Sequence, residues 1–223
     1  MIPLRDTIPS QKFPVINWML IIANVVIFII EISQGDSKAF IFEYGLVPAE
    51  TPLFGDNSHT FFTNMFLHGG VGHLLTNMWM LYIFGDNVED RMGSFRYLIF
   101  YILAGVIAGF THYMLNLNSG IPAVGASGAI SGVMAAYMFL FPNSMIISFV
   151  PLLFIPLLIP VPAIIFIGIW FIGQFLSGTS SLLLGETGAG IAFWAHIGGF
   201  LGGLAIYKAF TKSKEKVYRM PFR

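Results

Sequence analysis

The sequence contains no cysteine and few charged residues. Only 10% of its 223 residues are Asp, Glu, Lys or Arg, against about 25% in an average soluble domain. The lack of cysteine excludes a disulfide framework, a thiolate nucleophile and Cys-ligated zinc or iron–sulfur sites. The formal net charge is zero, so no overall field favours a nucleic-acid partner. With 56% hydrophobic residues, the composition indicates a protein whose solvent is the lipid bilayer.

Long apolar segments account for most of this hydrophobicity. A helix needs about 20 apolar residues to cross the hydrocarbon core, and six segments approach this length: 15–33, 70–86, 94–115, 125–141, 161–178 and 190–210. The first lacks a small-x-small cleavage site and further spans follow it, so we expect a retained helix and not a signal peptide. We therefore predict an all-α membrane protein, a six-helix bundle in one domain over 1–223 with short tails 1–14 and 211–223.

One apolar stretch does not fit this pattern. Residues 145–160 contain Pro151, Pro156 and Pro160, and proline in a helix interior breaks the helix. We predict an interfacial or extended connection here.

Basic residues gather on one side of the predicted bundle. They precede the first segment, lie between the second and third, and follow the sixth: Arg5, Lys12, Arg91, Arg96, Lys208, Lys212, Lys214, Lys216, Arg219 and Arg223. The opposite side has only Lys38. By the positive-inside rule both termini are cytoplasmic, and we expect a location in the plasma membrane of a prokaryote.

Polar residues inside the apolar segments are the strongest functional signal, because burying them in hydrocarbon is costly. His73 and Asn77 lie in the second segment, Ser127 opens the fourth, and His196 lies in the sixth. All three segments are even-numbered and begin on the same side, so at about 1.5 Å per residue these side chains reach a similar depth. One water-accessible cavity is expected to hold all four.

Glycine pairs indicate how these helices pack. Gly128 with Gly132, and Gly199 with Gly203, are small-xxx-small pairs beside Ser127 and His196. Such pairs let two helix backbones approach closely. A serine becomes a nucleophile when a base accepts its proton, and histidine suits that task near neutral pH. We predict a Ser–His dyad, with donors from His73, Asn77 and the Ser127 amide for an oxyanion. No carboxylate lies near His196 in the spans.

Four motifs in this order resemble the rhomboid intramembrane serine proteases. They are His73-x-x-x-Asn77, Glu89-Asp90-Arg91-Met92-Gly93, Gly125-Ala126-Ser127-Gly128, and Ala195-His196-Ile197-Gly198-Gly199 with Gly203 following.

The resemblance implies a six-helix fold. It also implies an enzyme that cleaves single-pass membrane-protein substrates in the lipid bilayer, without a cofactor, metal or nucleic acid. It assigns Ser127 as nucleophile, His196 as base, and His73, Asn77 and the Ser127 amide as oxyanion donors. Glu89 and Arg91 match a structural pair. Many members carry an aromatic residue that stacks on the histidine, one turn after the nucleophile. Here that position is Ser131, which leaves the orientation of the His196 ring open.

Other interpretations of the same residues stay open at this point. The serine motif also suits a tight helix start, and the histidines also suit bonds between helices. Two histidines without an obvious third ligand argue against a metal site. A non-proteolytic relative that binds membrane clients is the main alternative function, and a small transporter is a weaker one.

Further aromatic and histidine residues are assigned roles outside the chemistry. His59, His68 and His112 are expected near the membrane interface, and Trp79, Trp170 and Trp194 as packing or belt residues. For the fifth segment, the resemblance implies a border on the path of the substrate. Trp170, Phe171 and Phe175 are the candidates for closing that path.

Overall fold

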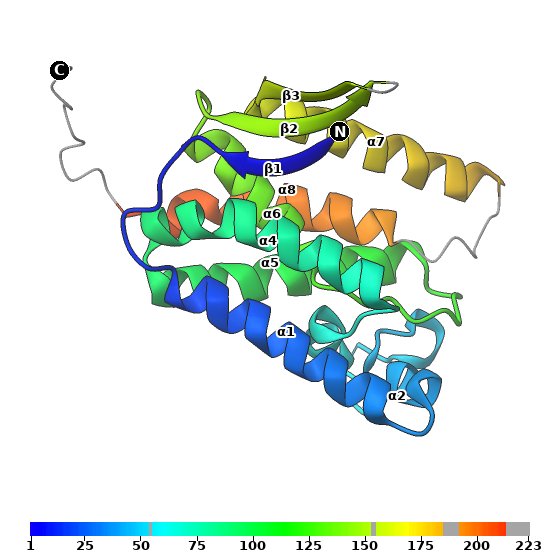
Figure 1. Ribbon diagram of the computed structural model, residues 1–223. Helices are drawn as coiled ribbons and strands as arrows, with labels where there is room; N and C mark the ends of the chain where they lie inside the picture. The colour runs from blue at the N-terminus through cyan, green and yellow to red at the C-terminus, as the bar shows by residue number, and fades with distance from the viewer. Residues whose placement is uncertain (54, 153–154, 185–191, 213–223) are drawn as a thin grey trace, which may run out of the picture.

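The computed structural model describes residues 1–53, 55–152, 155–184 and 192–212, in which helices predominate (Figure 1). The longer helices are α1 (Val15–Ser33), α2 (Ser37–Tyr44), α4 (Val71–Met92), α5 (Ser94–Leu115), α6 (Ser127–Leu140), α7 (Ala163–Leu184) and α8 (Phe193–Phe210). Between α2 and α4 lie the short helices η1 (Pro48–Glu50), α3 (Thr60–Thr63) and η2 (Asn64–Phe66). The strands are β1 (Ile2–Asp6), β2 (Met145–Leu152) and β3 (Ile155–Pro162). A long helix thus lies at each of the six apolar segments.

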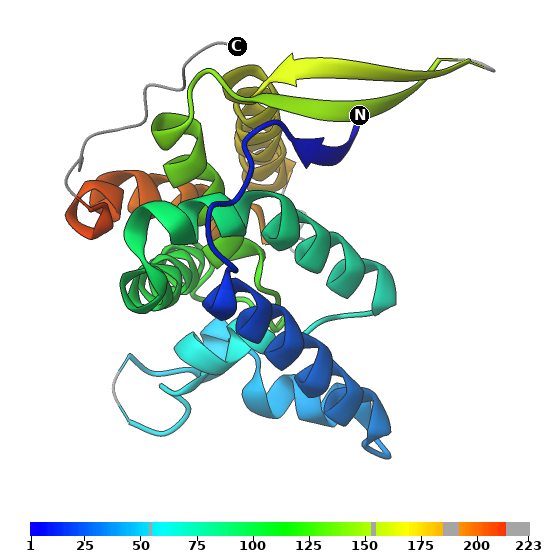
Figure 2. The same cartoon turned by 60° about the vertical axis from the view of Figure 1, so that its left-hand side comes forward.

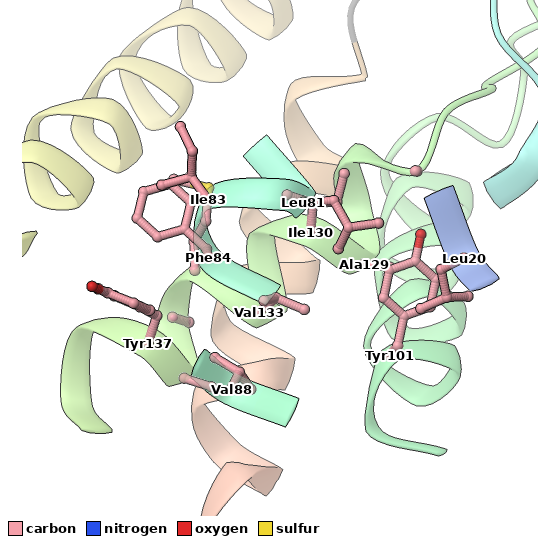
Figure 3. Packing of buried hydrophobic residues seen from close by; sticks show 14 of the residues in the cluster. Leu20, Leu81, Ile83, Phe84, Val88, Tyr101, Ala129, Ile130, Val133 and Tyr137 are labelled. Atoms are coloured by element: carbon pink, nitrogen blue, oxygen red, sulfur yellow. The ribbon is translucent and has the colours of Figure 1, made fainter. Parts of the chain in front are cut away.

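The core lies where α4, α5 and α6 meet. Figure 3 shows aromatic and aliphatic side chains of α4 and α6 facing one another, with Tyr101 of α5 and Leu20 of α1 beside them. The ring of Phe84 meets that of Tyr137 edge-on, with centroids 5.0 Å apart. Burial of this apolar surface is worth about 25 cal/mol per Å² where water is the reference. The packing of this apolar surface places α6, which begins with Ser127, at the centre of the helices.

An antiparallel sheet of order β1-β2-β3 packs on one side of the helices, opposite α2 and α3 (Figure 2). Ile2 pairs with Phe149, and Met145 pairs with Pro162. The extended connection predicted for 145–160 is therefore a β-hairpin that the N-terminal segment joins. The expected all-helical class is wrong in this respect. The pairing of β1 joins segments more than a hundred residues apart, and nothing in the local pattern signals such a contact.

Three of the helices in the described part of the chain are long and apolar enough to cross a membrane: α1, α5 and residues Ala163–Ser180 of α7. Helix α6 is apolar but has only 14 residues. Helix α4 extends six residues beyond its predicted end, and those last turns carry Glu89, Asp90 and Arg91. The structure therefore confirms a mainly helical protein with three candidate spans, and six spans remain a prediction.

Candidate active site

Ser127 lies at the first residue of α6, after a backbone turn that only glycine adopts readily. Gly125 has a φ of +126°, in the region that side chains disfavour. Its amide donates to the carbonyl of Asn64 at 2.9 Å, which fixes the turn against η2. A Cβ on Gly125 would lie 2.8 Å from the His73 ring. The turn therefore presents Ser127 at a helix N-terminus, where backbone N–H groups lack intrahelical partners.

His196 reaches Ser127 because α6 and α8 touch through their backbones. A Cβ on Gly199 would collide with the carbonyl of Gly128, and one on Gly203 would collide with the Cα of Gly132. This close approach places the His196 Nε2 atom 2.7 Å from the Ser127 Oγ atom. The two side chains come from residues 69 positions apart in the chain. The predicted serine and histidine are within hydrogen-bonding distance.

The other ring nitrogen of His196 has a partner that the sequence did not indicate. The Nδ1 atom lies 2.6 Å from the Oε1 atom of Gln174 on α7. With the amide oxygen as acceptor, this network assigns the proton to Nδ1 and leaves Nε2 free to accept the Ser127 hydroxyl proton. In this arrangement, Gln174 favours the tautomer whose Nε2 lone pair faces Ser127.

An aromatic ring also lies against His196, supplied by α7 and not by α6. The Trp170 ring centroid is 5.7 Å from that of His196, with 36° between the planes. Ser131, at the position where many rhomboid proteases carry an aromatic residue, is buried and donates to the Ser127 carbonyl at 2.6 Å. Trp170 therefore contacts the site, and its predicted role as a packing or belt residue is incomplete.

A cavity of about 600 Å³ opens over these residues. Side chains from α4, α6, α7 and α8 line it: His73, Thr76, Asn77, Met80, Ser127, Ile130, Ser131, Met134, Trp170, Gln174, Phe193 and His196. The four predicted polar residues share this cavity. Its volume lies within the range of small-molecule sites, about 300–1,000 Å³.

His73 and Asn77 lie beside the backbone turn at Gly125, which directly precedes Ser127. A Cβ on Gly125 would be 2.8 Å from His73 and 3.5 Å from the Asn77 Nδ2 atom. Asn77 is only 5% exposed, and its Nδ2 atom has no hydrogen-bond partner among the described residues. A buried donor without a partner costs about 1–3 kcal/mol. Such a donor is available to an oxygen atom that enters the cavity beside Ser127.

His68 differs from its prediction as an interfacial residue, because its side chain is 0% exposed. Its ring centroid lies 5.2 Å from that of His73. Burial, and secondarily the neighbouring His73, lowers the pKa of His68 to about 4. The His68 ring is therefore neutral at neutral pH. It packs edge-on against the His73 ring.

Glu89 and Arg91 face different partners, unlike the predicted structural pair. The Glu89 carboxylate accepts hydrogen bonds from the amides of Ile16 (3.1 Å) and Asn17 (2.8 Å) and from the Ser94 hydroxyl at 2.6 Å. The Arg91 guanidinium lies 5.7 Å from the Phe141 ring centre. Residues two apart on a helix point to different sides, which explains the correction. Glu89 instead caps the N-terminus of α1.

The described residues contain no group of three or more His, Asp and Glu side chains placed to hold a metal ion. The side chains that line the cavity bring several reactive groups together. They include a hydroxyl, an imidazole nitrogen within hydrogen-bonding distance of it and an unpaired donor on Asn77, a combination that suits nucleophilic attack on a carbonyl.

Comparison with known proteins extends these observations. Residues 56–213 match the sequence model of the Rhomboid domain. RHOMBOID-like protein 12, mitochondrial, of Arabidopsis thaliana is 30% identical over 158 residues, which are 63% of this chain and 43% of that protein. Presenilin-associated rhomboid-like protein, mitochondrial, of Mus musculus is 28% identical over 149 residues, 62% of this chain and 34% of that protein. The chain spans less than half the length of either relative.

The relatives contradict the predicted location in a prokaryotic plasma membrane. Their names place them in mitochondria, and Rhomboid-like protein 11 of Arabidopsis thaliana, 36% identical over 77 residues (34% of this chain and 27% of that protein), is named chloroplastic. The physical reason is that a bias of basic residues distinguishes the two sides of a membrane but not one membrane from another. The matched domain covers well over half of the chain, which belongs to the rhomboid family.

Proposed function

We propose that the chain is an intramembrane serine protease that uses Ser127 and His196 as a catalytic dyad. The observation that carries the proposal is the hydrogen bond of 2.7 Å between the Ser127 Oγ and His196 Nε2 atoms, in a cavity that also holds the unpaired Asn77 Nδ2 donor. The preferred substrates are single-pass membrane proteins whose helices reach the cavity from the bilayer.

In the first step, the Ser127 Oγ atom attacks the carbonyl carbon of the scissile bond while His196 Nε2 accepts the hydroxyl proton. The negative charge that develops on the carbonyl oxygen is stabilised by Asn77 Nδ2, by His73 and by the Ser127 amide. The carbon–nitrogen bond then breaks, and His196 returns the proton to the leaving amine. Water attacks the acyl–serine ester with His196 again as base, which releases the second product and restores Ser127.

The proposal includes six membrane-crossing helices. Helix α6 begins at Ser127, so a short helix of about 21 Å that starts below the membrane surface is expected for it. The charged residues of α4 lie in its last two turns, where headgroups and water are within reach. Relatives named mitochondrial and chloroplastic lead us to infer an organelle membrane as the location.

The test is cleavage of a purified single-pass substrate by the chain in detergent or liposomes. Wild-type protein is expected to cut it, whereas Ser127→Ala and His196→Ala are expected to lose measurable turnover. Ser131→Ala is the matched control, because Ser131 lines the same cavity but bonds to the backbone. Substrate binding without cleavage by wild-type protein would favour the non-proteolytic alternative, and activity in Ser127→Ala would refute the assigned nucleophile.

A further inference from the structure

Helix α7 is attached to the bundle differently from α6 and α8. The residues on its outer face are about half exposed: Ile164, Ile165, Ile169, Ile172 and Leu176. A Cβ on Gly168 or Gly173 would meet nothing within 4 Å, whereas one on Gly178, near the end of the helix, would lie 3.3 Å from Phe193 of α8. The middle of α7 is therefore not held by the close backbone contacts that join α6 to α8. Figure 1 shows α7 at the margin of the bundle, far from α1 and next to the sheet.

Around His196, the inner face of α7 packs on α8. The Phe171 ring stacks on Phe200 of α8 with centroids 4.3 Å apart. Trp170 lies against His196, and Gln174 bonds to it. Residues 167, 170, 171 and 174 share one helical face. The contacts that hold α7 closed therefore include the two contacts that hold the catalytic ring.

Among the residues that the structure describes, Gln174 is the one hydrogen-bond partner of the His196 Nδ1 atom. The titratable groups that influence the ring are His73 of α4 and His112 of α5, both imidazoles. A neutral imidazole without this partner can carry its proton on either nitrogen.

We propose that Gln174 is a positioning residue that couples the closure of α7 to the reactivity of Ser127. The inference rests on the proposed protease function. When α7 packs on α8, Gln174 keeps the proton on Nδ1 and the lone pair of Nε2 toward Ser127. When α7 moves aside to admit a substrate helix, Gln174 and Trp170 leave the ring together. The dyad then stays inactive until α7 closes again.

The positioning role predicts a loss in turnover and not in binding. Gln174→Met removes the acceptor oxygen but keeps the length of the side chain. We expect kcat on a soluble, unstructured peptide to fall roughly 10- to 100-fold with KM unchanged, as small misplacements of catalytic groups do. Gln174→Glu keeps an acceptor and should retain most of the turnover. The acidic limb of its pH–rate profile should move to higher pH, because a carboxylate beside the ring stabilises the imidazolium.

The control is Thr179→Val on the same helix, whose hydroxyl bonds to the carbonyls of Phe175 and Leu176. It should leave turnover unchanged. Equal losses in Gln174→Met and Gln174→Glu, with an unmoved pH profile, would overturn the positioning role in favour of simple packing. Wild-type kinetics in Gln174→Met would overturn it as well.

The coupling itself is tested by locking α7 onto α8. The chain has no cysteine, so cysteines introduced at Phe171 and Phe200 can be joined by a short cleavable cross-linker. The locked enzyme should react with a small fluorophosphonate at the unlocked rate but should not cleave a membrane substrate until the linker is cut. Loss of fluorophosphonate labelling in the locked enzyme would contradict the coupling.

The two proposals fail in different ways. If Ser127→Ala still cleaves substrate, the protease assignment is wrong whatever Gln174 does. If Ser127→Ala is inactive while Gln174→Met matches wild type, only the coupling is wrong.

Discussion

The interface of α5, α6 and α8 and the interface of α7 with α8 place the same histidine by opposite means. In the first, glycines and alanines bring backbones together: a Cβ on Gly128 would lie 2.6 Å from the Cβ of Ala108, and one on Gly199 would collide with the backbone of Gly128. In the second, large rings fill the space, such as Phe171 on Phe200. Backbone contact tolerates almost no displacement, whereas contact between long side chains can be broken and remade.

The difference separates two tasks at the site. The close interface fixes the backbone positions of Ser127 and His196, which sets the distance between their side chains. The loose interface supplies Gln174 and Trp170, which determine how the ring points. The proposed function requires both, because an enzyme that admits a helix from lipid needs one part that stays fixed and one part that moves.

The largest expected effect comes from filling the close interface. Gly199→Val should prevent α6 and α8 from packing, because the added side chain would meet the Gly128 carbonyl. We expect little folded protein and no turnover, measured by size-exclusion profile and thermal unfolding in detergent. Gly168→Val is the control on α7, where a Cβ meets nothing within 4 Å. Similar behaviour of the two variants would contradict the contrast between the interfaces.

The next largest effect on turnover is expected from the hydrogen-bond donors on helix α4. Asn77→Ala should lower kcat by roughly 10- to 1,000-fold with little change in KM, since it removes a donor aimed at the oxyanion. His73→Ala should act in the same direction. Thr76→Val is the matched control, because Thr76 lines the cavity but its hydroxyl donates to the Gly72 carbonyl. Unchanged kcat in both Asn77→Ala and His73→Ala would assign these residues to packing alone.

A smaller effect is expected from loosening α7. The structure separates the three aromatic residues that the sequence grouped together as a substrate gate. Phe175 is 47% exposed and meets Trp194 edge-on, so Phe175→Ala should raise cleavage of membrane substrates a few-fold by easing opening. Trp170→Ala should instead lower turnover of every substrate, because Trp170 contacts His196.

Parallel assays with a membrane substrate and a soluble peptide distinguish these outcomes. Phe175→Ala should change only the first, and Trp170→Ala should change both. Equal gains on both substrates in the two variants would remove the distinction between gate and ring support.

The smallest expected effect is on the pH dependence of stability, through Asp6 of strand β1. The Asp6 carboxylate accepts hydrogen bonds from the Tyr137 hydroxyl at 2.5 Å and from Asn87 at 3.0 Å. Burial raises the pKa of Asp6 above its ordinary value of 3.8, although the bond from Tyr137 opposes the shift. Because the folded state holds this proton more tightly than the unfolded state, stability should decline as the pH rises from about 4 through the raised pKa.

Asp6→Asn keeps an acceptor and removes this dependence. Thermal unfolding between about pH 4 and 7 should therefore be flatter in the variant than in wild type. Asp56→Asn, at an exposed position, should follow the wild-type curve. Identical curves for Asp6→Asn and wild type would show that Asp6 does not titrate in this range.

The sequence predicted those parts of the molecule that depend on local pattern or on residue type. Apolar length located the long helices, and polar residues within them identified Ser127, His196, His73 and Asn77. The sheet was missed because β1 pairs with residues far away in the chain. Gln174 is a polar residue inside the fifth apolar segment, but nothing in the sequence links it to His196 until α7 is packed on α8. Glu89 was paired with Arg91 from the motif, although its hydrogen-bond partners lie at the starts of α1 and α5.

The most direct measurement is to locate the covalent adduct formed with a fluorophosphonate. We predict that mass spectrometry of the labelled peptide that contains both Ser127 and Ser131 will place the adduct on Ser127, and that His196→Ala will abolish labelling. An adduct on Ser131, or labelling that persists at the wild-type rate without His196, would contradict the Ser–His dyad.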